Sequence, residues 1–152
     1  MLKINKNLST SLSLAASYAL GAGFIAAAAL LPAILKAYIR FTERDCLLDS
    51  FGTILALFYG VVVIGIAADA ALIILLHHVK RGIVFTDGSV ACIRAISWAC
   101  VAEGVIFAVL TAYFRFSVLV AAAALFIGLI VRVVKNVIEE ATAIKNENDM
   151  TV

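Results

Sequence analysis

The chain has 152 residues, of which 64% are apolar and only 14% carry a charge. Soluble domains are typically about half apolar and about a quarter charged, so this composition excludes a water-soluble globule. It also excludes a disordered segment, which requires low hydrophobicity and high net charge. The formal charge of +2 is too small to indicate direct nucleic-acid binding. The composition therefore predicts a single polytopic membrane domain over residues 1–152.

The first apolar segment is too long for a secretory signal. Lys3 and Lys6 precede an uncharged run of 24 residues at positions 12–35. A signal-peptide core has about 7–15 apolar residues, whereas a helix that spans a bilayer needs about 20. The sequence therefore predicts an uncleaved transmembrane helix over residues 12–38. Pro32 lies near its far end and predicts a kink or an early end of this helix.

Three further helices are predicted at residues 51–79, 90–114 and 117–146. None of these segments shows the alternation of apolar and polar residues that is typical of a membrane β-barrel. Thr86 or Asp87 is expected to cap the third helix. Short connections favour antiparallel neighbours, so the predicted fold is an all-α, antiparallel bundle of four transmembrane helices. The fourth helix is expected to continue as a cytoplasmic amphipathic extension.

The distribution of basic residues predicts the orientation of the chain. Four spans place both termini on the same side of the membrane. That side would carry eight basic residues, namely Lys3, Lys6, Lys80, Arg81, Arg94, Arg132, Lys135 and Lys145. The opposite side would carry four, namely Lys36, Arg40, Arg44 and Arg115. The positive-inside rule counts Lys and Arg in short loops, so we expect a bacterial inner-membrane protein with both termini in the cytoplasm.

Two carboxylates interrupt the apolar helices. Asp69 lies nine residues before His78, and Glu103 lies 12 residues after Ala91. At 1.5 Å per residue, both would lie about 14–18 Å from the cytoplasmic face, on neighbouring helices. An ionised group costs about 2.5–3.5 kcal/mol at the bilayer centre, so both acids should face the bundle interior. They form either a proton or cation site or a structural hydrogen-bonded pair, and both interpretations stay open.

The sequence contains no pattern that indicates catalysis or metal binding. The three cysteines, Cys46, Cys92 and Cys100, form no CxxC or Cys/His spacing. His77 and His78 end the second predicted helix, where a partial positive charge is favoured. The chain also lacks a Ser/His/Asp arrangement, a glycine-rich phosphate loop and an HExxH motif. We therefore expect no enzyme activity, no metal and no cofactor.

The segment after Val131 is amphipathic. Its apolar residues recur at spacings of three and four, at Val134, Val137, Ile138, Ala141 and Ile144. Such a stripe suits a helix that lies on the membrane surface, one that continues the fourth helix into the cytosol, or one that binds a partner helix. A solvated helix end is the plainer alternative.

Three passages together resemble a known family: GIVFT at 82–86, IRAISW at 93–98 and KNENDMTV at 145–152. They are similar to the YoaS-like family of small bacterial membrane proteins, a domain of unknown function with four expected spans. Members of that family are often encoded beside a short Cro/CI-type helix-turn-helix regulator. The resemblance thus implies a membrane partner for a small DNA-binding protein, and it implies no catalytic residues.

The expected cytoplasmic loop and tail are on the same side of the membrane in this topology, and we expect them to form one docking surface. Its candidate residues are Arg81, Phe85, Thr86, Asp87, Arg94, Glu147, Asn148 and Asp149. The first functional hypothesis is a regulatory or scaffolding membrane protein that sequesters the regulator there. The second is a small proton- or cation-coupled transporter or channel that uses Asp69 and Glu103 and acts as a homo-oligomer. The third is an immunity or stress protein that binds a lipid or a toxin in the bilayer.

Overall fold

The computed structural model describes residues 6–43 and 47–150, with side chains for residues 9–43 and 47–147. The described residues form four helices and no strand: α1 (Lys6–Thr42), α2 (Phe51–Lys80), α3 (Asp87–Leu110) and α4 (Ser117–Met150). All four helices are long and apolar enough to cross a membrane. The prediction of an all-helical protein with four segments of membrane-spanning length is therefore confirmed.

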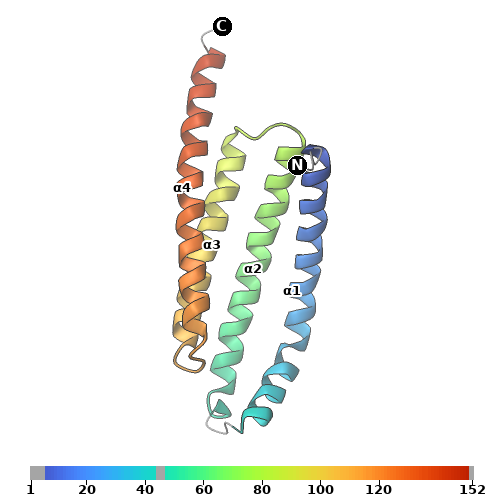
Figure 1. Cartoon of the computed structure of the whole chain (residues 1–152), viewed down its shortest axis with the longest axis vertical. Coiled ribbons are helices and arrows are strands. Elements are labelled where there is room, and N and C mark those ends of the chain that lie inside the picture. Colours follow the sequence, from blue (N-terminus) through green and yellow to red (C-terminus); the bar gives the residue numbers. More distant parts are fainter. Residues whose placement is uncertain (1–5, 44–46, 151–152) are drawn as a thin grey trace, which may run out of the picture.

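The helices pack in chain order. α1 packs on α2, α2 packs on α3, and α3 makes the most extensive contacts with α4. Figure 1 shows the start of α1, the α2–α3 connection and the end of α4 at one end of the molecule, which we call the terminal end. The other two connections lie at the opposite end, called the loop end. At the terminal end α4 extends beyond the other three helices (Figure 1).

α3 and α4 approach closely because glycines face the partner helix. A Cβ atom at Gly104 would lie 2.7 Å from Cγ of Leu125, and one at Gly128 would lie 3.2 Å from Cγ2 of Val101. The buried Ser97 hydroxyl donates a 3.0 Å hydrogen bond to the carbonyl oxygen of Gly128. In lipid, small interface residues and interhelical hydrogen bonds hold helices together. This seam positions the α4 extension beside the start of α3.

The buried apolar core lies at the loop end. Its buried members come from the end of α1, the α1–α2 connection, the start of α2 and the end of α3: Leu35, Ile39, Leu47, Ile54 and Leu110. Aromatic rings surround this core, and Tyr38 meets Phe114 edge to face with ring centroids 5.6 Å apart. Apolar and aromatic packing therefore joins α1, α2 and α3 at the loop end.

The ends of α1 and α3 differ from those expected. α1 continues through Pro32 to Thr42, so it does not end early. Figure 1 shows its last part bending toward the start of α2, in line with the alternative of a kink. A helix that crosses lipid must satisfy its backbone groups internally, which favours a bend over a break. α3 begins at Asp87 rather than at residue 90 and ends at Leu110 rather than at residue 114. Its start is earlier because Thr86, one of the two expected residues, provides the N-cap.

Candidate functional site

A buried hydroxyl fixes the α2–α3 connection. Ser89 has no exposed surface, and its Oγ lies 3.2 Å from Nδ1 of His78 and 3.1 Å from Oγ1 of Thr86. Thr86 Oγ1 also accepts a 3.4 Å hydrogen bond from the backbone N–H of Ser89. These contacts tie the end of α2 to the first turn of α3. Thr86, expected as a docking residue, is thus also a helix cap.

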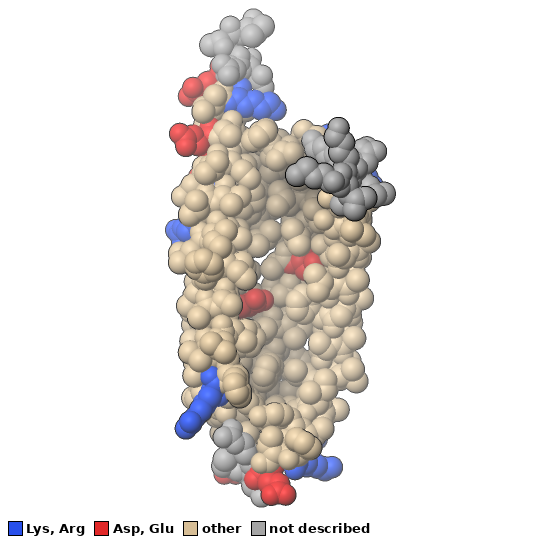
Figure 2. Space-filling model, in the orientation of Figure 1, with Lys and Arg blue, Asp and Glu red and all other residues tan. Residues whose placement is uncertain are grey.

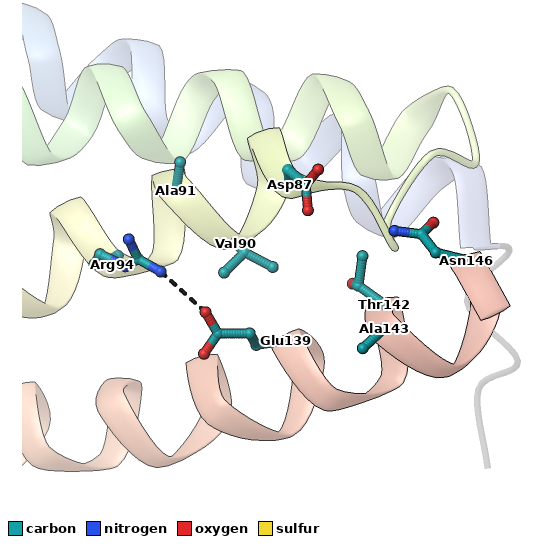
Figure 3. Close-up of a pocket in the computed structure, with 8 residues that line it drawn as sticks. All are labelled: Asp87, Val90, Ala91, Arg94, Glu139, Thr142, Ala143 and Asn146. Atoms are coloured by element: carbon teal, nitrogen blue, oxygen red, sulfur yellow. Dashed lines mark hydrogen bonds and ion pairs between the residues drawn. The ribbon is translucent and has the colours of Figure 1, made fainter.

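A cavity of about 320 Å³ lies between the first turns of α3 and the extension of α4. We call it the polar cavity, and it is lined by Asp87, Val90, Ala91, Arg94, Glu139, Thr142, Ala143 and Asn146. Figure 3 shows Asp87 and Asn146 near its outer end and the Arg94–Glu139 pair deeper along the helices. Small and apolar side chains, with Val90 buried, form its floor between these polar groups. The cavity therefore combines a short apolar floor with a polar, charged rim.

Arg94 and Glu139 form the inner wall of the polar cavity, and Lys135 pairs with Glu139 from outside it. Arg94 Nη2 lies 3.0 Å from Glu139 Oε1, and this ion pair joins α3 to α4 (Figure 3). The second carboxylate oxygen of Glu139 lies 2.5 Å from Nζ of Lys135, one turn earlier on α4. The Glu139 carboxylate is shared between two cations, so the cluster carries a net positive charge.

Arg94 and Asp87, two of the candidate docking residues predicted from the sequence, line this cavity, but the residues of α4 that form its other wall were not predicted. Both walls follow the same helical spacing of i, i+3, i+4 and i+7, at 87, 90, 91 and 94 on α3 and at 139, 142, 143 and 146 on α4. On α4 this face lies beside the apolar stripe singled out from the sequence. Three residues of that stripe are exposed: Val134, Val137 and Ile144. Val134 also lines an apolar groove against α2 and α3, together with Ile138.

The other expected docking residues do not converge on the polar cavity. Arg81 and Phe85 are exposed in the α2–α3 connection at the terminal end. Glu147 is exposed on the last described turn of α4. The side chains of Asn148 and Asp149 lie outside the described part of the structure. The connection and the α4 extension share one end of the molecule, and the first turns of α3 link them.

Each of the two acids in the apolar helices lies against a glycine of a neighbouring helix. Asp69 on α2 is 8% exposed, and its Oδ2 lies 2.9 Å from the position that a Cβ atom would take at Gly21 of α1. Glu103 on α3 places Oε1 3.5 Å from the corresponding position at Gly65 of α2. Because Gly65 and Asp69 are one turn apart on the same face of α2, the two carboxylates lie at similar depth.

Neither carboxylate has a charged or hydrogen-bonding partner among the described side chains. No basic side chain forms an ion pair with Asp69 or Glu103 among the residues that the structure describes, and the described side chains offer neither of them a hydrogen bond. Figure 2 shows acidic side chains in the hollowed middle of one face, far from the charged ends of the molecule. Two acids without an ion-pair partner among the described residues thus lie at similar depth in the middle of the bundle.

Among the described side chains, at residues 9–43 and 47–147, no group of three His, Cys, Asp or Glu residues is close enough to hold a metal ion. Cys92 and Cys100 are half-buried free thiols, and Cys46 lies outside the described residues. His77 directs Nδ1 to the carbonyl oxygen of Ile73 at 2.9 Å, within its own helix.

Comparison with known proteins places the chain in a family without fixing its activity. Neither the curated proteins nor the solved structures contain a match to it. The family model described as "Protein of unknown function (DUF2975)" matches residues 15–152, which takes in all of the polar cavity and both intramembrane acids. The chain therefore belongs to the DUF2975 family of proteins of unknown function.

Proposed function

We propose that this protein is a non-enzymatic regulatory or scaffolding protein of the bacterial inner membrane. In this proposal the four helices form an antiparallel bundle with both termini in the cytoplasm. The terminal end is then the cytoplasmic end, and a protein partner docks there. The observation that carries the proposal is the polar cavity between α3 and the α4 extension. There a charged rim surrounds a short apolar floor at the terminal end of the molecule.

The chemistry of the polar cavity suits a segment of protein. Val90 and Ala143 form an apolar floor that accommodates an aliphatic side chain, while Asp87 and Asn146 present hydrogen-bonding groups at the rim. Small apolar clusters surrounded by polar rims are typical of protein interfaces. The partner we propose is a small helix-turn-helix regulator, which the resemblance to the YoaS-like family supports. Its capture at the membrane would keep it from DNA.

Site-directed photocrosslinking tests this proposal. A photoreactive residue at Asn146, on the cavity rim, should crosslink a small helix-turn-helix protein in intact cells, identified by mass spectrometry. The same residue at Leu119, an exposed α4 position at the loop end, is the matched control and should not. Docking at the polar cavity would be contradicted if the regulator crosslinked at neither position, or if it crosslinked equally at both.

A second candidate function, a proton- or cation-coupled transporter, is supported by Asp69. This carboxylate is nearly buried and has no ion-pair partner among the described side chains. Unpaired acids inside a membrane domain are typical of ion pathways. The test is proton flux into liposomes that contain the purified protein. Asp69→Asn and Glu103→Gln should each abolish flux, whereas Asp49→Asn, outside the helices, should not. Equal flux in all variants and in empty liposomes would exclude this function.

A further inference from the structure

A second, smaller pocket adjoins the polar cavity on the same side of the α3–α4 seam. It has a volume of about 70 Å³ and is lined by Arg94, Ser97, Trp98, Arg132 and Lys135. We call it the basic pocket. Three of its five lining residues are cations, which come from both helices, and its volume is enough for one small polar group. This composition differs from that of the polar cavity, whose rim also carries two acids.

The basic pocket keeps an excess of positive charge. Glu139 is the acid that pairs with two of its cations, at 3.0 Å from Arg94 and 2.5 Å from Lys135. Arg132 makes no ion pair among the described residues. Its guanidinium lies 5.3 Å from the centre of the Trp98 ring, in a cation–π contact. One carboxylate against three cations leaves about two positive charges facing the pocket.

The backbone of the pocket residues lies just inside the hydrocarbon core, from which long basic side chains reach the lipid headgroups. Arg132 lies 15 residues after Ser117, which is about 22 Å along α4. Arg94 lies 16 residues before Leu110, which is about 24 Å along α3. The hydrocarbon core is about 30 Å thick, and long basic side chains extend from inside it toward the interface. Trp98, a residue type enriched at that interface, lies one turn deeper on α3 and lines the same pocket.

The surface below the pocket is apolar. One or two turns toward the loop end, on the same helix faces, lie Val105, Leu125 and Leu129, whose side chains are 55%, 38% and 60% exposed. A free phosphate would gain nothing from these side chains. An acyl chain that hangs from a phosphate in the basic pocket would lie along them. The arrangement therefore fits a lipid with an anionic headgroup better than a soluble anion.

We propose that Arg94, Arg132 and Lys135 bind the phosphate headgroup of an anionic glycerophospholipid in the leaflet at the terminal end. Planar guanidinium groups recognise phosphate oxygens with two parallel hydrogen bonds, and Lys135 adds a point charge. The bound lipid bridges α3 and α4 just below the polar cavity. This site goes beyond the proposed docking function, because it requires no protein partner.

Trp98 is the only tryptophan of the chain and lines the basic pocket, so it reports binding directly. The purified full chain is reconstituted in nanodiscs of phosphatidylcholine with increasing phosphatidylglycerol, and Trp98 fluorescence is followed. Native mass spectrometry of the same protein measures which lipid is retained. We expect a saturable fluorescence change and preferential retention of phosphatidylglycerol. Equal retention of both lipids would overturn the proposal.

Charge variants locate the site. Lys135→Gln should weaken phosphatidylglycerol binding about fivefold, the factor that one cation contributes near an anionic surface. Glu139→Gln should strengthen it by a similar factor, because it releases two cations from a shared carboxylate. Arg115→Gln, which removes an exposed cation at the loop end, is the matched control and should change nothing. A loss in Arg115→Gln as large as that in Lys135→Gln would refute the assignment.

Two further measurements complete the test. Arg132→Gln serves as the second variant. The binding of phosphatidylglycerol to this variant is judged from lipid retention, because the substitution also alters the contact with Trp98. Circular dichroism verifies that each variant keeps the helix content of the parent chain. Inorganic phosphate added to nanodiscs of phosphatidylcholine alone should leave Trp98 fluorescence unchanged. If phosphate reproduces the change, the site binds a free anion and the lipid assignment is wrong.

Discussion

Gly104 is the residue at which α3 and α4 leave least room for a side chain. A Cβ atom there would lie 2.7 Å from Cγ and 3.3 Å from the backbone nitrogen of Leu125. The leucine side chain can rotate away, but its backbone cannot move without displacing α4. We therefore expect Gly104→Ala to destabilise the protein by about 1–3 kcal/mol, the usual cost of overpacking.

Gly23→Ala is the matched control for this substitution. Gly23 also lies inside a helix, but nothing approaches within 4 Å of its Cβ position. Alanine removes the conformational cost of a helical glycine, about 0.5–1 kcal/mol, so Gly23→Ala should be neutral or stabilising. Thermal unfolding in detergent, followed by circular dichroism, measures both variants. Equal melting temperatures would mean that the α3–α4 seam is looser than the structure indicates.

At the scale of the element, the start of α3 depends on one side-chain cap. The Thr86 hydroxyl accepts from the backbone N–H of Ser89 at 3.4 Å and also meets the Ser89 hydroxyl. Thr86→Ala removes both contacts and should cost about 1 kcal/mol. Amide hydrogen exchange at Ser89 and Val90 should accelerate, because the first turn of α3 then frays. Thr53→Ala, an exposed threonine within α2, should leave exchange in α3 unchanged. Unaltered exchange in Thr86→Ala would show that the cap is dispensable.

The helices themselves were predictable, but the faces they present to one another were not. Long uncharged runs suffice to find four spans, because a bilayer requires about 20 apolar residues per helix. In lipid, however, both the buried and the exposed faces of a helix are apolar, so hydrophobic periodicity carries little information. The exposed Val137 and the buried Val90 look alike in the sequence. Asp69 was recognisable as an interior residue because its charge breaks this uniformity.

The polar cavity was missed for a related reason. Its two walls follow the i, i+3, i+4 and i+7 spacing, yet no sequence rule states that residues 87–94 and 139–146 lie side by side. That pairing follows from the length of α4 and from the close approach of the two helices at Gly104 and Gly128. Arg94 was identifiable as a candidate because it is a lone cation near a helix start, whereas its partner Glu139 lies 45 residues away.

At the scale of the whole molecule, the proposed orientation has a direct test. In a cysteine-free background, Gly82→Cys places a thiol in the α2–α3 connection, and Arg115→Cys places one in the α3–α4 connection. With the terminal end in the cytoplasm, a membrane-impermeant maleimide should label Arg115→Cys in intact spheroplasts. It should label Gly82→Cys only after permeabilisation. The reverse pattern would contradict the count of basic residues, and it would place the polar cavity outside the cell.

The distribution of packing along the molecule leads to the last prediction. Ile54 has no exposed surface and belongs to the core at the loop end, whereas Ile66, on the same helix, is 40% exposed. Ile54→Ala should therefore cost about 2–5 kcal/mol by leaving a cavity. Ile66→Ala removes the same atoms from a partly lipid-exposed surface, and its melting temperature should fall much less.

Hydrogen exchange in Ile54→Ala also tests whether the core at the loop end and the α3–α4 seam are stabilised independently. If the core at the loop end holds α1 and α2 to the rest of the bundle, Ile54→Ala should raise hydrogen exchange most in these two helices. The α3–α4 seam has its own glycines and the Ser97 hydrogen bond, so exchange in α4 should rise least. A uniform rise across all four helices would mean that the bundle opens as one unit. Retained protection in α4 would instead leave the polar cavity and the basic pocket formed on a stable helix pair.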